Sequence, residues 1–330
     1  MRSSGDKAVR LGVIGCGNVA VRRHLPVLRN VPSFRVCALA DPSPECLEAA
    51  RRTCPEARCF PSGAALLEAG GIDAVAICTP LPFHVRLATL ALRNDVAVLL
   101  EKPAAMTVAE CENLVCAVRE ASVPVLLGFN KRWLPSIRQA VPLVSGDLLG
   151  EVRAVNVVYC SAHEDGHVPV WRTARGKGGG TLFEEAVHVL DLCRFLLRDE
   201  FESVSCTLGS GREAEDEPVL LQARMRSGTL VCSLVSDYLP SRFEMEILGT
   251  RRALLLSPNR FDGLSIQEKW EYAGSLKARF HQAARTIRAL PRALAELRAG
   301  GTYQSSYRAE WEHFLRVLRV EETPECSVLD

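Results

Sequence analysis

Apolar residues follow a strand-like pattern along the first part of the chain. Short, predominantly apolar runs occur at VRLGVI, at FRVCALA and at residues 74–78, 96–100 and 123–127. Runs without alternation are typical of parallel strands that are buried on both faces. Segments with helical spacing separate them, so the pattern predicts a doubly wound α/β domain with a parallel sheet.

The turn after the first run has glycines where a dinucleotide site needs them. VRLGVIGCGNVAVRRHLPVL passes through Gly15, Gly17 and Ala20 before it becomes helical. The first glycine permits a tight turn, the second lets backbone approach a pyrophosphate, and a small third residue allows the helix to pack on the strand. The pyrophosphate then lies at the helix N-terminus, where free N–H groups favour negative charge.

The second run, FRVCALAD, ends in Asp41, near the spacing expected for an acid that binds the adenosine ribose. Pro42 and Ser43 follow it, where an arginine would be needed to neutralise a 2′-phosphate. NAD is therefore favoured over NADP. Asp41 could instead cap the next helix, but Ser43 before Pro44 already supplies that start signal.

Three short motifs follow the last three of these apolar runs: TPLPFH, EKP and GFNKRW. Ligands bind beyond the carboxyl ends of strands in such sheets, so these motifs are candidates for the site. After EKP, Thr107 and Glu110 have the spacing of a capping box, which predicts the start of the next helix.

The segment GGGTLFEEAVHVLDL places titratable groups in an apolar run. On a regular helix three of them share one face: Glu184, His188 and Asp191. Apolar side chains share another face, predicted to pack: Phe183, Val187 and Leu190. By itself the segment fits either a proton-transfer site or a buried histidine satisfied by a carboxylate.

Composition narrows the function classes. The 330 residues favour two domains, and 48% hydrophobic content can fill them. The 40 Lys and Arg residues balance 39 Asp and Glu residues, which argues against nucleic acid as the main partner. A basic cluster over residues 269–298 is interpreted as a solvated helical face, with contact to an anionic partner left open.

The N-terminus and the cysteines bear on the cellular compartment and on metal binding. The N-terminus MRSSGDKAVR lacks an apolar signal region, and no stretch reaches the length of a membrane span, so we predict a cytoplasmic protein without a membrane partner. The 13 cysteines are odd in number and form no C-x-x-C, so we expect reduced thiols and no metal.

In combination, the motifs GCGNVA, TPLPFH, EKP, GFNKRW, VWR and GGGTLFEEAVH resemble the Gfo/Idh/MocA family of glucose-fructose oxidoreductases and inositol dehydrogenases. The resemblance implies a Rossmann domain over residues 1–127. Residues 128–330 would form an α/β domain with a large, open, mostly antiparallel sheet, with a helix near residues 303–319 packing back on the first domain. One sheet face would cover the active site and the other would mediate a homodimer or homotetramer. The family pattern continues beyond PECSVLD into another helix, whereas this sequence ends at Asp330.

The resemblance also implies catalytic roles. Lys102 of EKP corresponds to the lysine that contacts the reacting hydroxyl, and His188 to the histidine that exchanges its proton. A histidine titrates near neutrality, and a nearby cation stabilises a developing alkoxide. The family has aspartate and glycine where this sequence has Glu184 and Ala186. Glu184 is therefore the third catalytic candidate, in a pocket that both changes could reshape, and Glu185 is a weaker one.

The candidate residues form two sets. Those expected to bind NAD are Gly15, Gly17, Asn18, Val19, Ala20, Asp41, Thr79, Pro80, His84, Glu101 and Lys102. Those expected to bind substrate are Lys102, Arg132, Trp171, Arg172, Glu184 and His188, with His84 a further candidate for the pocket rim.

The resemblance predicts an NAD-dependent oxidoreductase. Its substrate would be a secondary hydroxyl, or the matching ketone, of a sugar, nucleotide sugar or cyclitol. One alternative is a redox-neutral elimination or glycosidic cleavage driven by retained NAD. Another is a dinucleotide-binding regulatory protein, which is expected to lose the lysine and histidine that are present here.

Overall fold

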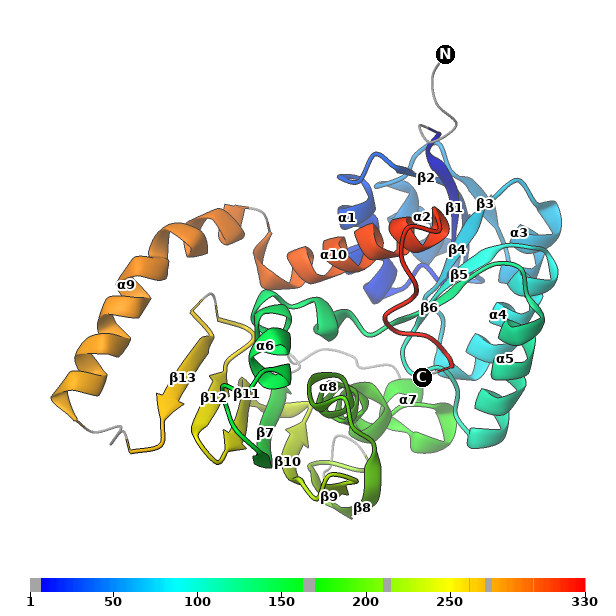
Figure 1. Ribbon diagram of the computed structural model, residues 1–330. Helices are drawn as coiled ribbons and strands as arrows, with labels where there is room; N and C mark the ends of the chain where they lie inside the picture. Colours follow the sequence, from blue (N-terminus) through cyan, green and yellow to red (C-terminus); the bar gives the residue numbers. More distant parts are fainter. Residues whose placement is uncertain are drawn as a thin grey trace. The chain divides into compact units, whose positions relative to one another are not determined.

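The computed structural model describes residues 7–162, 170–209, 215–260, 262–270, 275–298 and 300–329. The chain divides into two compact units. The first comprises Met1–Phe129 with Tyr307–Asp330, and the second comprises Asn130–Ser306. Each unit contains one sheet (Figure 1).

The sheet of the first unit has six parallel strands in the order β3-β2-β1-β4-β5-β6. The strands are β1 (Val9–Ile14), β2 (Phe34–Ala40), β3 (Arg58–Phe60), β4 (Ala74–Ile77), β5 (Ala97–Glu101) and β6 (Val125–Gly128). This is the predicted doubly wound sheet, and the order reverses between β1 and β4. The three later runs predicted as strands are confirmed, with ends shifted by one or two residues.

Helices cover both faces of this sheet (Figure 1). They are α1 (Leu25–Leu28), α2 (Pro44–Arg51), α3 (Gly63–Ala69), α4 (His84–Arg93) and α5 (Val108–Glu120). The Ser43 hydroxyl caps α2 by accepting from Cys46 N–H at 3.2 Å. Thr107 caps α5 in the same way through Glu110 N–H, as predicted, while the Glu110 carboxylate accepts from Met106 N–H at 2.9 Å.

The end of the chain belongs to the first unit. Trp311 and Phe314 of α10 (Gly301–Leu318) are fully buried. Phe314 stacks on Phe34 at the start of β2, with ring centroids 6.4 Å apart. Beyond α10, the Cys326 carbonyl accepts from Leu127 N–H of β6 at 2.9 Å, so the last residues also contact the sheet.

The sheet of the second unit has seven strands in the order β13-β12-β11-β7-β10-β9-β8. They are β7 (Val152–Ala162), β8 (Phe201–Leu208), β9 (Val219–Met225), β10 (Leu230–Ser236), β11 (Tyr238–Gly249), β12 (Arg252–Leu256) and β13 (Leu264–Glu268). Neighbouring strands are antiparallel except β7 and β10, which confirms the predicted mostly antiparallel sheet.

Helices of the second unit are α6 (Pro135–Ser145), α7 (Val170–Thr173), α8 (Val187–Leu197) and α9 (Leu276–Arg298). A wide π turn over Leu182–Ala186 leads into α8. Its hydrogen bonds span five residues, so the register differs from the regular helix assumed from sequence. The fully buried stripe of the turn and helix is Ala186, Val189, Leu192, Cys193 and Leu196, while the predicted packing residues Phe183, Val187 and Leu190 are half-buried.

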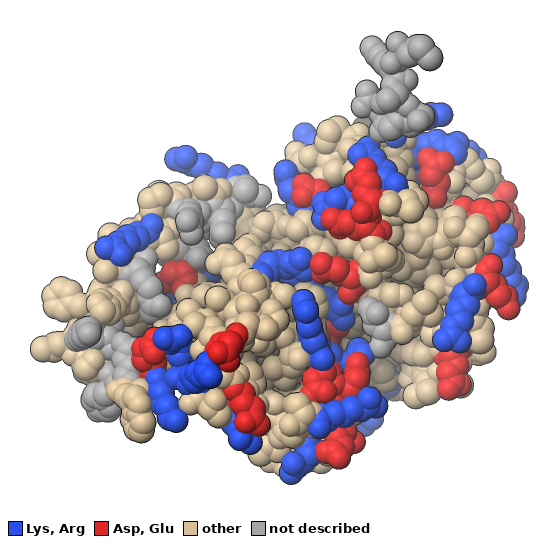
Figure 2. Space-filling view, viewed as in Figure 1, with Lys and Arg blue, Asp and Glu red and all other residues tan. Residues whose placement is uncertain are grey.

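The surface carries charges of both signs. Figure 2 shows acidic and basic side chains interspersed on the visible face.

All 13 cysteines are free thiols. Within the part of the chain that the structure describes, every helix is too short or too polar to cross a bilayer.

One buried acid generates a stability prediction. Glu310 of α10 is fully buried, and no described group lies within hydrogen-bonding distance of its carboxylate oxygens. Burial, and to a smaller extent the Glu101 charge, raises its pKa well above the usual value. We expect Glu310→Met to raise the melting temperature, because removing an unsatisfied buried polar group recovers about 1–3 kcal/mol. Calorimetry at pH 8 checks this; a lowered melting temperature would show that the carboxyl group has a partner.

Candidate functional site

The turn after β1 has the geometry of a dinucleotide cradle. Gly15 has φ +87°, and a Cβ there would lie 2.6 Å from the Cys78 carbonyl group, so a side chain does not fit. At Gly17 a Cβ would meet nothing within 4 Å, which leaves the backbone open to an approaching group. Ala20 is fully buried, while Asn18 and Val19 are exposed at the start of the helix. Their N–H groups belong to the first turn, which has no intrahelical acceptors.

Asp41 lies directly beyond β2 and supports this turn. Its carboxylate accepts from Cys16 N–H and from Ser43 N–H, each at 2.8 Å. It therefore fixes the glycine turn to the start of α2, while Ser43 is the cap of that helix. Each carboxylate oxygen has a second lone pair, so Asp41 can still accept ribose hydroxyls.

The residues after β4 include a buried hydroxyl group. Thr79 Oγ1 has no described hydrogen-bond partner, and it lies beside the turn in which Gly15 contacts Cys78. Such a group fits a bound polar ligand better than a packed core. Together with Gly15, Gly17 and Asp41, Thr79 suits a dinucleotide, whose nicotinamide supplies a hydride acceptor when it is bound.

The EKP turn is held by two buried histidines. His84 is 1% exposed, and its ring nitrogens lie 2.8 Å from the Pro103 carbonyl oxygen and 2.9 Å from that of Thr79. Burial lowers the His84 pKa despite these contacts. The neutral ring can then donate to one carbonyl only. His84 thus joins the EKP turn to the residues after β4, and its predicted contact with cofactor or substrate stays a prediction.

Glu101 anchors the same turn from the other side. Trp311 Nε1–H donates to His24 Nδ1 at 3.1 Å, so the proton of the neutral His24 ring is on Nε2 and donates to Glu101 at 2.8 Å. The other Glu101 oxygen accepts from Lys102 N–H at 3.2 Å. Burial is the largest single effect and opposes the charged form, but the His24 contact together with the Lys102 charge and N–H group outweighs it, and the Glu101 pKa is lowered. Glu101 therefore fixes the backbone of Lys102, and its predicted contact with cofactor stays a prediction.

The glycine-rich segment of the second unit makes room for a helix cap. At Gly180, with φ +94°, a Cβ would lie 2.5 Å from an Asp216 carboxylate oxygen. That carboxylate accepts from the N–H groups of Thr181 and Leu182, each at 2.9 Å. Thr181 Oγ1 also donates to Glu217 at 2.5 Å. The start of the His188 helix is therefore fixed by acids about 35 residues further along the chain.

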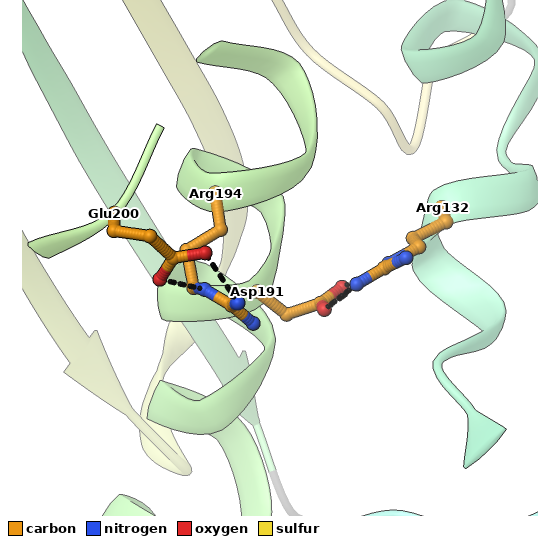
Figure 3. A network of polar contacts seen from close by, with 4 residues as sticks. All are labelled: Arg132, Asp191, Arg194 and Glu200. Carbon is orange, nitrogen blue, oxygen red and sulfur yellow. Dashed lines mark hydrogen bonds and ion pairs between the residues drawn. The ribbon is translucent and has the colours of Figure 1, made fainter. Parts of the chain in front are cut away.

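Three carboxylates of this turn and helix pair with three different cations. Asp191 accepts two hydrogen bonds from the buried Arg132 guanidinium, at 2.9 and 2.5 Å, beside the Arg194–Glu200 pair (Figure 3). Glu185 accepts from Lys131 at 2.7 Å, and Glu184 lies 3.7 Å from Arg172. His188, 4% exposed, lies in the first turn of α8, directly after the π turn that carries both glutamates.

A second group of polar side chains surrounds Glu185. Lys131 also donates to the Tyr159 hydroxyl at 2.5 Å, and burial raises the Tyr159 pKa well above its usual value. Ser161 donates to Asp237 at 2.6 Å. Burial, reinforced by the Glu185 charge, raises the Asp237 pKa to about 7. This part of the second unit therefore holds a carboxyl group that titrates near neutrality.

The predicted substrate residues of the second unit lie in different surroundings. Arg132 pairs with Asp191, and both side chains are at most 7% exposed, so Arg132 is a buried cation, while its predicted contact with substrate stays a prediction. Arg172 and Glu184 do come together. Trp171 lies in α7, and its side chain is outside the described residues.

The sequence pattern did not predict that Lys131, Tyr159 and Asp237 belong to the polar cluster around Glu185. The adjacent Lys131 and Arg132 of GFNKRW gave a signal, because two neighbouring cations in an otherwise apolar segment need acidic partners. Among the described residues, no three His, Cys, Asp or Glu side chains are grouped as a metal site.

The fold and the glycine turn define a dinucleotide-dependent oxidoreductase, and sequence comparison identifies the family. Residues 9–129 match the "Oxidoreductase family, NAD-binding Rossmann fold", and residues 137–255 match the "GFO/IDH/MocA C-terminal domain". The chain belongs to the Gfo/Idh/MocA family, and its first unit is an NAD-binding domain.

Individual relatives agree with this assignment. The chain is 30% identical over 261 residues to D-apiose dehydrogenase of Paraburkholderia graminis, covering 76% of this chain and 68% of the relative. It is 28% identical over 223 residues to inositol 2-dehydrogenase of Rhizobium meliloti, covering 65% of each. Other curated relatives are matched over about half of their length, such as a putative UDP-kanosamine synthase oxidoreductase subunit of Amycolatopsis mediterranei, at 52%.

The fold is similar to that of the WlbA dehydrogenase from Bordetella pertussis, solved with NADH and UDP-GlcNAcA. The TM-score is 0.81 at 21% identity, covering 98% of this chain and 91% of that one.

The Asp41 geometry predicts cofactor preference. We expect NADH to bind more tightly than NADPH, and Asp41→Ala to narrow the difference, because a charged hydrogen bond contributes about 1.5–3 kcal/mol. Titration calorimetry with both dinucleotides measures this. Tighter binding of NADPH to the unmodified protein would contradict the assignment, and Glu45→Ala, on an exposed side chain of α2, is the control.

Asp237 predicts a pH dependence of stability. Its pKa is about 7 in the folded protein against an ordinary 3.8. Between these values the folded state keeps a proton that the unfolded state has lost, so stability falls as pH rises. Asp237→Asn should remove this penalty, so its advantage over the unmodified protein should grow by up to about 1.4 kcal/mol per pH unit from pH 4 to 7. Urea unfolding at pH 5 and pH 7.5 tests this; an advantage independent of pH would place the titration elsewhere.

The two adjacent glutamates should differ in their effect on stability. Glu185→Ala leaves the buried Lys131 without its carboxylate, and breaking such a pair costs about 3–5 kcal/mol. Glu184→Ala breaks a longer, more exposed pair worth about 0–1 kcal/mol. Thermal unfolding of the two variants compares them directly. Equal melting temperatures would mean that Lys131 is stabilised by Tyr159 alone.

Proposed function

We propose that the protein transfers a hydride between NAD and a secondary hydroxyl, or the matching ketone, of a sugar, nucleotide sugar or cyclitol. The observation that carries this proposal is the combination of an NAD-binding unit with a second unit in which the buried His188 lies between Glu184, Glu185 and Asp191 in the sequence. Relatives named D-apiose dehydrogenase and inositol 2-dehydrogenase support the substrate class.

In this mechanism His188 accepts the proton of the substrate hydroxyl, because a histidine titrates close to neutral pH. The Lys102 ammonium group stabilises the developing alkoxide. The anchoring of the EKP turn by His24, Glu101 and His84 supports this role, because it limits the backbone positions from which Lys102 can act.

Glu184 and Arg172 are proposed as substrate contacts. Their separation of 3.7 Å, with side-chain exposures of 17% and 28%, is that of a loose pair that a polar ligand can insert into or replace. Glutamate and Ala186, at positions where the family has aspartate and glycine, would then shape the pocket for a particular polyol.

We also propose that the protein is a homodimer or homotetramer that associates through the open face of the second sheet. Apolar side chains are exposed on this face of β9 and β10: Leu220 at 38% and Leu230 at 51%, opposite the buried Val219 and Val231. Exposed apolar patches are uncommon on monomers. The cytoplasmic location stays a prediction.

His188→Asn and Lys102→Met test the mechanism. Each should lower kcat by about 10²–10⁴, the usual contribution of a positioned acid or base, and His188→Asn should leave NADH affinity unchanged. NADH formation is followed by absorbance with a panel of sugars, nucleotide sugars and cyclitols, on the best substrate found. The control is His281→Asn, an exposed histidine of α9.

Full activity of both variants would refute the mechanism. Product formation without net NADH would instead identify a redox-neutral reaction. A stoichiometric complex with a regulatory protein, without turnover on any polyol, would favour the regulatory alternative.

A further inference from the structure

Helix α9 carries a heptad repeat. Apolar residues alternate at intervals of four and three residues along it: Leu276, Phe280, Ala283, Ile287, Leu290, Leu294 and Leu297. Spacing that averages 3.5 residues keeps side chains on one narrow stripe, as in the seam of a coiled coil. We call these seven residues the α9 seam.

The α9 seam is exposed within this chain. Its six large side chains are 47–80% exposed, from Leu290 at the low end to Leu276 at the high end, and Ala283 is exposed as well. In Figure 1, α9 runs along the edge of the second unit beyond β13. Such a continuous apolar stripe in water is unfavourable, so it indicates a surface that another molecule covers.

A different face of α9 contacts the rest of the second unit. Thr286 donates to Asp262 at 2.8 Å, and Ala293 is 6% exposed. Both residues occupy the position that precedes a seam residue, so the helix is held along one flank and the seam remains outside. Pro291 lies on the other flank, so the apolar spacing continues across it.

The width of the stripe and the distribution of charge favour a helix as the partner. An amphipathic helix that lies in a membrane surface has a broad apolar face, whereas a two-residue-per-heptad stripe is typical of coiled coils. Exposed basic residues such as Arg288 lie off the seam. The positions corresponding to a are Phe280, Ile287 and Leu294, and those corresponding to d are Leu276, Ala283, Leu290 and Leu297, a combination compatible with two-stranded packing.

A second copy of this chain supplies the required stripe. The exposed area of six large apolar side chains is on the order of the ~800 Å² that each partner contributes to a standard interface. None of the seven seam positions is charged, and Arg285, Arg288 and Arg292 occupy heptad positions away from the seam, so two copies can pair without placing charges within the seam. We propose that α9 pairs with α9 of a second copy in a two-stranded coiled coil, as an interface separate from the sheet face.

The test is the mass of the full chain in solution. Leu290→Glu with Leu294→Glu places charges in the seam, whereas Gln282→Glu with Ala295→Glu adds the same charge at exposed positions of α9 off the seam. We expect the seam variant to halve the mass measured by light scattering and the matched control to keep it. A monomeric unmodified protein, or a seam variant with the control's mass, overturns the proposal.

A third variant distinguishes the contribution of the sheet face to assembly from that of the α9 seam. Leu220→Glu with Leu230→Glu disrupts only the proposed sheet contact. Two independent twofold interfaces generate a tetramer, so either variant alone should then stop at a dimer and their combination at a monomer. If the seam variant halves the mass and the sheet variant leaves the mass unchanged, the coiled coil is supported and only the sheet interface is refuted. NADH binding by calorimetry checks that every variant is folded.

Photo-crosslinking provides a second test that introduces no charge. With p-benzoylphenylalanine in place of Leu290, irradiation should give a covalent dimer whose joined peptides both lie within residues 276–298. The same group in place of Ala295 should give little. Crosslinks from position 290 to another segment overturn the proposal. So does seam-dependent sedimentation with phosphatidylglycerol vesicles at unchanged protein mass, which would assign the stripe to a membrane surface.

Discussion

The buried pairing of Arg132 with Asp191 is the constraint on which the second unit depends. Both charges have left water, which is tolerated only because two well-aligned hydrogen bonds join them. Arg132 also lies over the Phe195 ring, 5.0 Å from its centroid, so the guanidinium contacts the helix at two levels. The turn after β6 is thereby fixed to α8, the helix that carries His188.

Lys131 extends the same arrangement by one residue. It reaches Glu185 and Tyr159, which links the turn after β6 to the π turn before α8 and to β7. The acids of the glycine-rich motif thus contact different cations. Asp191 and Glu185 hold the helix in place, whereas Glu184 forms the longer pair with Arg172 and is the carboxylate best placed to respond to a ligand.

In the first unit, buried histidines hold the EKP turn in place. His24 and His84 are both buried, and each ties the EKP turn to a different neighbour. A donor chain from Trp311 through His24 to Glu101 joins the C-terminal helix to the strand that ends beside Lys102. Residues far apart in the sequence therefore determine the backbone position of a single proposed catalytic lysine.

The sequence by itself predicted five of the six strands of the first sheet, the glycine turn and the helix caps at Ser43 and Thr107, because these follow from local sterics and short-range periodicity. It also placed His188 on a helix with acids nearby. Only the tertiary structure decided which cation each acid pairs with, since Lys131 and Arg132 are neighbours yet reach partners 54 and 59 residues away. The π turn likewise escaped prediction, because one extra residue per turn leaves no periodic signal in so short a segment.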